Sequence, residues 1–216
     1  MTPLIVGLTG QTGAGKSTAS AYFRREGFAV IDCDQVAREV TRASGECLPH
    51  LVREFSDSIL APDGELNRKA LGSMVFQDKQ KLLRLNEIIF PFITSDIREK
   101  IRELEVSGAE VIFLDAPTLF ESGADQMCGL ILSVTGKDEV RKRRIMARDG
   151  LTEEAARNRM NSQLDEAFFR SHSDFVIENN GSPEELETQL ASARAFLIHF
   201  ISQKHSGGPA SSAADA

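Results

Sequence analysis

The sequence has few cysteines, no long apolar run and no excess of positive charge. Its three cysteines, Cys33, Cys47 and Cys128, lie far apart, with no Cys-x-x-Cys spacing and no histidine cluster beside them. This spacing argues against a zinc site and against a disulfide framework, and it favours reduced thiols in the cytoplasm. No run approaches the ~18 apolar residues that a membrane-spanning helix needs, so we expect no membrane contact.

The charge balance is acidic, because 32 Asp and Glu against 25 Lys and Arg give a formal net charge of −7. Non-specific nucleic-acid binding depends on basic surface that displaces counterions, so we expect no nucleic-acid partner. The first residues, MTPLIVGLTG, lack the basic start and unbroken apolar run of a signal peptide. We therefore expect a cytoplasmic protein with one compact core at a length of 216 residues, and a monomer with at most weak self-association.

Five short apolar runs recur between helical patterns, and none of them alternates with polar residues. Such runs are typical of strands buried on both faces, as in a parallel sheet covered by helices. The helical segments between them favour an α/β fold with right-handed crossovers. The predicted strands are Leu4–Leu8, Phe28–Ile31, Val111–Leu114, Leu130–Val134 and Phe175–Ile177.

Two helical intervals interrupt this alternation. Residues 35–107 contain no clear strand, and we predict a helical substrate-binding domain there, with a turn at Ala61–Gly64. Pro91 is expected to break a longer helix of this domain in two. The second interval, 137–170, is rich in arginine and is predicted to form a lid. The nucleotide-binding core then comprises residues 1–34, 108–136 and 171–204, and residues 205–216 form a disordered tail.

The segment 10-GQTGAGKST-18, which follows the first predicted strand, matches the complete phosphate-binding pattern G-x-x-x-x-G-K-[ST]. Its glycines let successive backbone N–H groups turn toward phosphate oxygens. Lys16 is expected to reach the β- and γ-phosphates, and the Ser17 hydroxyl to coordinate Mg²⁺. A glycine-rich turn with a chance lysine is the alternative, but the strand before the motif and the helical pattern after it argue against this alternative. The predicted nucleotide contacts are Gln11, Thr12, Gly13, Ala14, Gly15, Lys16, Ser17 and Thr18.

Carboxylates follow two further predicted strands. Asp32 and Asp34 follow the second strand, and Asp115 ends the third. Because ligands of open α/β sheets bind beyond the carboxyl ends of the strands, Asp34 is placed to accept a hydrogen bond from an acceptor hydroxyl. Helix N-capping competes with this role of Asp34. Asp115 could hold Mg²⁺ or only close its strand, and Glu121 could serve the same site or begin a helix.

Cations cluster in the predicted lid. On a helix, Arg141, Arg144 and Arg148 lie along one side, because they are three and seven residues apart. Solvated surface charge is the default explanation for such a run. Beside a triphosphate, cations on a closing lid would instead offset charge on the phosphoryl oxygens. We predict that Arg148 contacts phosphate and that Lys142 and Arg143 are solvated.

Three classes of protein share this phosphate-binding pattern. A GTPase needs a guanine-reading Asn/Thr-Lys-x-Asp, but the nearest match, 135-TGKD-138, has its lysine and aspartate adjacent. A nucleic-acid motor would be longer and would carry basic strips. A small-molecule kinase needs an acceptor pocket and mobile cations over the transferring phosphoryl group. The helical insertion could supply the pocket and the arginine segment the cations, so we favour a kinase.

Several stretches together resemble one family, the dephospho-CoA kinases. They are 7-GLTGQTGAGKST-18, 31-IDCDQVARE-39, 63-DGELNRKALG-72, 115-DAPTLFESG-123, 144-RIMARDGLTEEAARNRMNSQ-163 and 174-DFVIENNGS-182. The resemblance implies a P-loop fold similar to nucleoside monophosphate kinases, with a five-stranded parallel core, a helical substrate domain and a lid. It also implies ATP as phosphoryl donor, Mg²⁺, and dephospho-CoA as acceptor. The reaction it implies is transfer of the γ-phosphate to the ribose 3′-hydroxyl, the last step of CoA synthesis.

The same resemblance assigns residue roles. Asp34 matches the family's proposed catalytic aspartate, Arg38 a neighbouring substrate contact, and Arg144 and Arg148 the lid arginines. From the motifs themselves, Ser17 and Asp115 are the expected metal ligands. The expected catalytic set is Asp34, Lys16, Arg144 and Arg148. Another small-molecule P-loop kinase, acting on a nucleoside monophosphate or a metabolite hydroxyl, is the alternative, and a non-catalytic ATP-binding module is a third.

Four further positions concern the same resemblance. Gln163 and Asn179 match recurrent polar positions, for which helix surface and turn formation are the alternatives. Phe90 stands before a proline where the family usually has histidine. Phe169, with Arg170 beside it, stands where the family usually has lysine. Neither departure touches the P-loop or Asp34, so the expected reaction type is unchanged.

Overall fold

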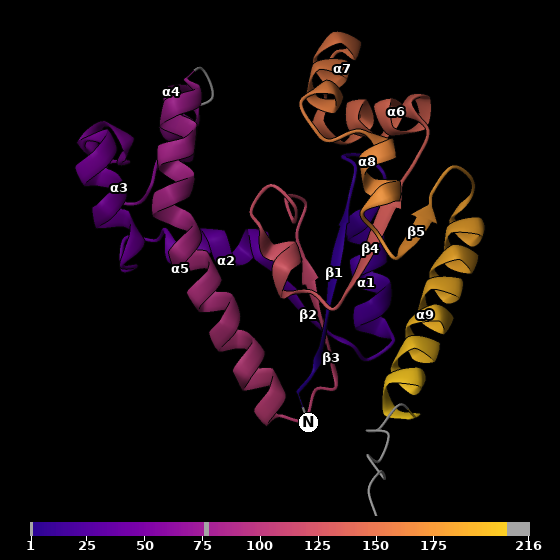
Figure 1. Cartoon of the computed structure of the whole chain (residues 1–216). Coiled ribbons are helices and arrows are strands. Elements are labelled where there is room, and N and C mark those ends of the chain that lie inside the picture. Colours follow the sequence, from indigo (N-terminus) through magenta and orange to yellow (C-terminus); the bar gives the residue numbers. More distant parts are fainter. Residues whose placement is uncertain (1, 76–77, 207–216) are drawn as a thin grey trace, which may run out of the picture. The chain divides into compact units, whose positions relative to one another are not determined.

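The five predicted strands form one sheet with the order β2-β3-β1-β4-β5 (Figure 1). The structure is a computed structural model that describes residues 2–75 and 78–206. Strands β1 and β2 both pair in parallel with β3, and β4 pairs in parallel with β5. The prediction of an α/β fold around a five-stranded parallel sheet is confirmed. The strands are β1 (Leu4–Gly10), β2 (Ala29–Asp32), β3 (Val111–Asp115), β4 (Leu130–Thr135) and β5 (Phe175–Glu178).

The chain divides into two compact units, which we call the first unit and the second unit. The first unit comprises Met1–Thr9 and Arg24–Ile131, and the second comprises Gly10–Phe23 and Leu132–Ala216. Helices of the first unit are α2 (Cys33–Val40), α3 (Cys47–Phe55), α4 (Arg68–Val75) and α5 (Lys79–Val106), with 3₁₀ turns η1 (Asp57–Ile59) and η2 (Ala124–Met127). The second unit holds most of α1 (Lys16–Arg25), together with α6 (Asp138–Asp149), α7 (Glu153–Asn161), α8 (Glu166–Ser171) and α9 (Pro183–Ser206).

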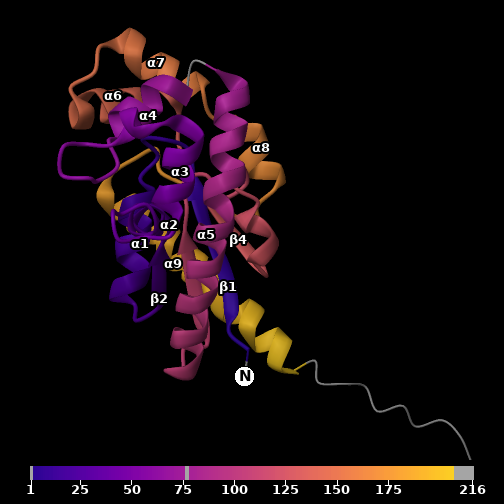
Figure 2. The same cartoon turned by 90° about the vertical axis from the view of Figure 1, so that its left-hand side faces the viewer.

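Among the described residues 35–75 and 78–107 the regular elements are α2 to α5 and η1, as predicted for a helical interval, and α3 and α4 both lie against α5 (Figure 1, Figure 2). A separate apolar cluster forms between these helices, which explains why the interval folds without a strand of its own. The predicted turn at Ala61–Gly64 is confirmed, because the Gly64 N–H donates to the Ala61 carbonyl at 2.9 Å. The buried members of the cluster are Cys47, Leu51, Phe55, Ile59, Leu71 and Val75.

Helix α5 runs through Pro91 without interruption, so the predicted break is wrong. Proline removes one backbone donor, and the Glu87 carbonyl therefore loses its partner four residues on. Apolar packing on both sides of the proline outweighs this cost. Residues before and just after it, among them Ile88 and Phe92, pack on the cluster of α3 and α4. Further along, Ile97 is buried against β2, β3 and α2.

The C-terminal helix α9 packs on β5, where the rings of Phe175 and Phe196 lie 5.2 Å apart (Figure 1). The helix continues to Ser206, so the predicted start of the tail at residue 205 is wrong, and the rest of the predicted tail, residues 207–216, lies outside the described residues. Across residues 2–75 and 78–206, no helix combines the length and the apolarity that crossing a membrane requires. The three cysteines are free thiols, and Cys47 is buried.

Candidate active site

The P-loop forms the predicted junction between β1 and α1. Gly10 ends β1, and α1 begins at Lys16, so the positive end of the helix faces the loop. Gly10, Gly13 and Gly15 all have positive φ, at 147°, 75° and 103°, which side chains rarely adopt. The loop is closed internally by a 3.1 Å hydrogen bond from the Ala14 N–H to the Gln11 carbonyl. Strand, glycine-rich loop and helix therefore occur in the order that phosphate binding requires.

Two of these glycines also make room for protein. A Cβ on Gly13 would lie 2.8 Å from the Arg141 carbonyl oxygen and equally close to Ile145, both of which belong to α6. A Cβ on Gly15 would lie 2.4 Å from the Asn179 side-chain nitrogen. The second unit thus packs α6 and the residue after β5 directly against the loop. The glycines serve this packing as well as the turn.

Three polar side chains hold the P-loop backbone. The Thr12 N–H donates to Gln163 Oε1 at 2.7 Å, and Arg141 Nε donates to the Thr12 carbonyl at 3.0 Å. Asn179 Nδ2 donates to the Ala14 carbonyl at 2.7 Å. Gln163 lies between α7 and α8, so the helix-surface alternative for it is wrong. Asn179 is 5% exposed and binds the P-loop, so turn formation alone does not describe it.

The three arginines on one side of α6 have different environments. Arg141 is 2% exposed, and its burial lowers the pKa of its guanidinium. Arg144 is half-buried and donates to Asn179, through Nη1 to the carbonyl oxygen at 3.0 Å and through Nη2 to Oδ1 at 2.9 Å. Arg148 is exposed and forms two bonds with the neighbouring Asp149, which raise its pKa. The default explanation of a purely solvated charge run fails for Arg141.

Lys142 corrects a second expectation about this helix. It is buried, although solvation was predicted, because its ammonium group pairs with Glu139 and Glu153 at 2.7 Å each. The pair with Glu153 joins α6 to the first turn of α7, and the pair with Glu139 lies within α6. Arg143 is exposed, as predicted. The basic segment is therefore partly a structural joint between two helices.

In the first unit, the acid that caps α2 is Asp32 and not Asp34. Asp32 accepts the Gln35 N–H at 3.0 Å with extended backbone angles, which is the geometry of an N-cap. Asp34 lies in the first turn of the helix and is exposed. The capping explanation for Asp34 is thus wrong, and its carboxylate is accessible at the start of the helix.

Three carboxylates gather at the carboxyl ends of β2 and β3. Asp32 lies in register with Asp115, and Asp115 lies in register with Leu8 of β1, two residues before Gly10. Asp115 is buried at the end of β3. Burial raises the pKa of the Cys33 thiol to about 12, and the negative charges of Asp115, Asp32 and Asp34 contribute to the shift. This edge of the sheet therefore carries a concentrated negative potential.

Arg38 is exposed on α2, one turn after Asp34. Arg68 supports this end of the helix, because it donates to the Arg38 carbonyl at 3.3 Å and to Thr41 Oγ1 at 2.7 Å. Burial lowers the pKa of Arg68, and the positive charge of Arg38 lowers it further. Our reading of the sequence missed this contact, because 30 residues separate the partners and only the family-like stretch 63–72 draws attention to Arg68.

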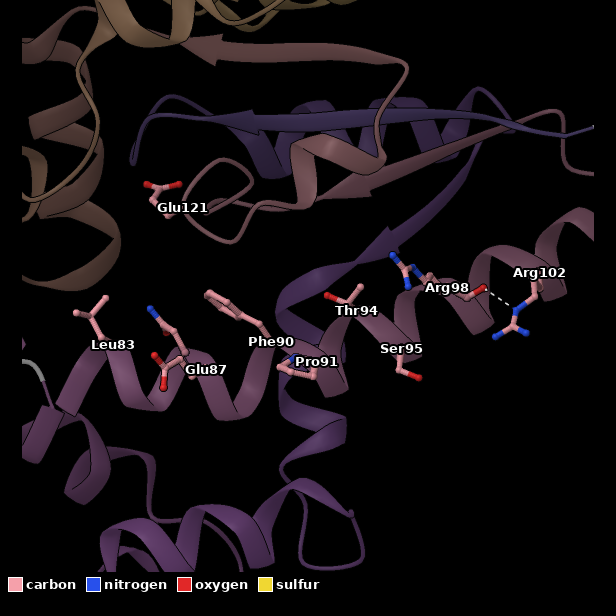
Figure 3. A pocket seen from close by; sticks show the side chains of 10 residues that line it. Leu83, Glu87, Phe90, Pro91, Thr94, Ser95, Arg98, Arg102 and Glu121 are labelled. Atoms are coloured by element: carbon pink, nitrogen blue, oxygen red, sulfur yellow. Dashed lines mark hydrogen bonds between the residues drawn. The ribbon is translucent and has the colours of Figure 1, made fainter. Parts of the chain in front are cut away.

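A cavity of about 820 Å³ lies along α5 in the first unit (Figure 3). Phe90 and Thr94 point from α5 into the open space, and Glu121 faces it from the loop after β3. Glu121 lies in a turn, so of its two alternatives the one in which it begins a helix is wrong. The lining mixes apolar and polar side chains at one end and is cationic at the other, and it comprises Leu83, Asn86, Glu87, Phe90, Pro91, Thr94, Ser95, Arg98, Arg102 and Glu121.

Comparison with known proteins places this chain. The family model for dephospho-CoA kinase matches residues 4–185, which is most of the chain. The chain belongs to the dephospho-CoA kinase family. A dephospho-CoA kinase of Arabidopsis thaliana is 42% identical over 186 residues, which cover 86% of this chain and 80% of the plant protein. Members of the family phosphorylate dephospho-CoA with ATP as the donor, in the final step of CoA biosynthesis.

Two solved structures agree with this membership. TT1252 from Thermus thermophilus is 35% identical, with a TM-score of 0.79 over 91% of this chain and 99% of that one. The dephospho-CoA kinase from Campylobacter jejuni is 28% identical, with a TM-score of 0.67 over 93% of this chain and 98% of its own. The resemblance deduced from the sequence motifs is therefore confirmed at the level of family and fold.

Proposed function

We propose that this member of the family transfers the γ-phosphate of ATP in line to the ribose 3′-hydroxyl of dephospho-CoA. In this proposal the P-loop binds the triphosphate, Lys16 neutralises charge on the β- and γ-phosphates, and Asp34 orients the hydroxyl. The observation that carries it is that Asp34 is exposed in the first turn of α2 while Asp32, and not Asp34, caps this helix. The register of Asp32, Asp115 and Leu8 supports it, because the P-loop leaves β1 at the same edge of the sheet.

Mg²⁺ is the cation that this proposal requires. Ser17 offers a hydroxyl in the first turn of α1, and Asp115 offers a carboxylate at the end of β3. These oxygen donors fit Mg²⁺, which takes few protein ligands and completes its shell with phosphates and water. When bound, the ion offsets negative charge on the β- and γ-phosphate oxygens. Asp115 holds the ion directly or through water in this assignment.

Arg148 is the lid residue that we assign to the transferring phosphoryl group. Its side chain is exposed at the end of α6, and its bonds to Asp149 join two neighbouring residues of the chain. An exposed ion pair of this kind contributes little free energy, so phosphate oxygens can replace the carboxylate at small cost. Arg38, one turn from Asp34, is assigned to the acceptor. These roles, the monomeric state and the location in the cell stay predictions.

Transfer to dephospho-CoA can be distinguished from the alternatives in one assay. ADP release is measured with ATP and Mg²⁺ in three parallel reactions, containing dephospho-CoA, AMP or no acceptor. We expect release above background only with dephospho-CoA, at one ADP per phosphorylated acceptor. Faster release with AMP would indicate a nucleoside monophosphate kinase. ATP binding without release in any reaction would indicate a non-catalytic module.

The α5 cavity is proposed to hold the pantetheine arm of the acceptor. The arm is long and carries methyl groups and amides, and a diphosphate joins it to the adenosine, so the cavity offers matching chemistry along its length. Phe90 and Leu83 supply apolar surface, Thr94 and Asn86 supply hydrogen-bonding groups, and Arg98 lies toward the cationic end. Glu121, in the loop after β3, also lines the cavity, which supports a position near the carboxyl end of β3. This proposal makes the predicted substrate domain the source of acceptor specificity.

Phe90→Ala is expected to raise KM for dephospho-CoA about tenfold, because burying an aromatic side chain against a ligand contributes about 1–3 kcal/mol. Binding of AMP, which lacks the arm, should be unchanged in calorimetry. Val106→Ala is the matched control, since Val106 lies on the same helix, is 89% exposed and does not line the cavity. An equal loss of affinity for dephospho-CoA and AMP, or no loss for either, would show that the arm does not bind in this cavity.

A further inference from the structure

We propose that Asn179 is a positioning residue that holds the P-loop in its phosphate-binding shape, and that Arg144 acts through Asn179 and not on the phosphates. This inference rests on the proposed function, because it assumes that the P-loop binds ATP. It assigns Arg144 differently from the family-based expectation, which places it among the catalytic lid arginines.

Asn179 uses each of its polar groups within the protein. Its backbone N–H donates to the Thr135 carbonyl at 2.9 Å, which continues the pairing of β5 with β4. Its side-chain nitrogen donates to the Ala14 carbonyl, and its two oxygens accept the two Arg144 bonds. Because Asn179 is 5% exposed, losing one partner leaves a buried polar group unsatisfied.

The bond to Ala14 controls the direction of the next N–H group. In a trans peptide, the carbonyl of one residue and the N–H of the following residue point in opposite directions. Asn179 draws the Ala14 carbonyl toward itself, so the Gly15 N–H points away from Asn179. A nest that binds phosphate needs consecutive N–H groups directed to one side. The bond thus fixes the orientation of a donor immediately before Lys16.

The same device operates two residues earlier. Arg141 draws the Thr12 carbonyl toward α6, which directs the Gly13 N–H to the opposite side. Gln163 Oε1 accepts the Thr12 N–H, so this N–H group helps to hold the loop in its conformation. The loop is therefore held by Arg141 and Gln163 at Thr12 and by Asn179 at Ala14. Asn179 differs from the other two because a cation holds it in turn.

Arg144 is placed to orient Asn179. Both of its terminal nitrogens bond to Asn179, one to the backbone carbonyl and one to the amide oxygen. This arrangement fixes which way the amide is turned, since its oxygen faces the guanidinium and its nitrogen faces Ala14. Arg148, one turn further along α6, is exposed, and its side-chain bonds among the described contacts go to Asp149 and not to Asn179. The two arginines therefore have separable roles.

The test is the dissociation constant of ATP and of ADP, measured with Mg²⁺ by calorimetry and without acceptor. Asn179→Ala is expected to raise the dissociation constants of ATP and of ADP by a similar factor of about tenfold, because the P-loop binds phosphates that ATP and ADP share. Arg144→Ala should raise both dissociation constants as well. The Arg144→Ala, Asn179→Ala double variant should bind each nucleotide no less tightly than Asn179→Ala alone, because Arg144 acts through Asn179.

Asn179→Asp separates the two functions of the side chain. It keeps an oxygen for Arg144 but presents an oxygen to the Ala14 carbonyl, so we expect nucleotide affinity to fall as far as in Asn179→Ala. Retained affinity in Asn179→Asp would show that Ala14 does not need the donor and would overturn the proposal. Thermal unfolding is recorded for each variant, because a merely structural residue would lower the midpoint without changing affinity in the folded protein.

Arg148→Ala is the matched control on the same face of α6. It should reduce the affinity for ATP more than the affinity for ADP and should lower kcat, as expected of a contact to the γ-phosphate. If Arg144→Ala gives this pattern instead, Arg144 is a phosphate contact and the inference is wrong. If Asn179→Ala does not fold, Arg144→Ala alone still decides between these outcomes. Absence of ATP binding by the unmodified chain would refute the proposed function and not this inference in particular.

Discussion

Asp34→Asn is expected to lower kcat by about 10²–10⁴-fold while the dissociation constant of ATP stays nearly unchanged. Asparagine has almost the same volume as aspartate but cannot take up a proton or bind a hydroxyl hydrogen as strongly as a carboxylate does. Asp34 is exposed in the first turn of α2, and another acid caps the helix, so the substitution should not disturb folding. The loss should therefore be confined to the step in which the acceptor hydroxyl is aligned.

Asp32 provides the matched control, because it is the same residue type two positions earlier, at the end of β2. Asp32→Ala removes the cap of α2 and should lower the free energy of unfolding by about 0.5–2 kcal/mol. Asp32→Asn keeps a good cap and should leave both stability and kcat close to those of the unmodified chain. Full turnover in Asp34→Asn, or an equal loss of turnover in Asp32→Asn, would remove Asp34 from the catalytic step.

The strands and the P-loop could be predicted because their signals are local. A run of consecutive apolar residues identifies a strand buried on both faces, and all five runs form strands of the sheet. The glycines of the P-loop specify positive φ in the sequence itself, as Gly13 and Gly15 show. Comparable local reasoning failed at Pro91, because the packing that carries α5 through the proline comes from α2, α3 and α4.

The contacts around the site could not be predicted from the sequence, because they join residues that are far apart along the chain. The motifs drew attention to Thr12 and Asn179 but not to their partners, because 165 residues separate Asn179 from the carbonyl that it holds at Ala14. Lys142 looks solvated until Glu153 of the next helix is placed beside it. Even the choice between Asp32 and Asp34 as cap depends on whether α2 begins at residue 33 or later. Spacing alone does not decide where a helix begins.

Lys16→Ala is expected to lower kcat by about 10³-fold, the upper range for removing one preorganised group that stabilises a developing charge. Lys16 is the first residue of α1, so it lies at the positive end of the helix dipole, where the P-loop joins the helix. Negative charge develops on the leaving oxygen of ADP as its bond to the γ-phosphorus breaks, and a fixed cation stabilises that charge. We expect KM for ATP to rise as well, because the same group binds the ground state.

The control removes an equal charge elsewhere in the second unit. Arg143→Ala takes a cation from α6, where the side chain is exposed and donates to the Glu139 carbonyl, and it should leave kcat within about twofold. Lys16→Arg tests geometry at constant charge, and the bulkier planar group should recover only a small part of the lost rate. Rates are read from ADP release with dephospho-CoA. Near-normal turnover in Lys16→Ala would mean that the glycine-rich loop does not hold the reacting triphosphate.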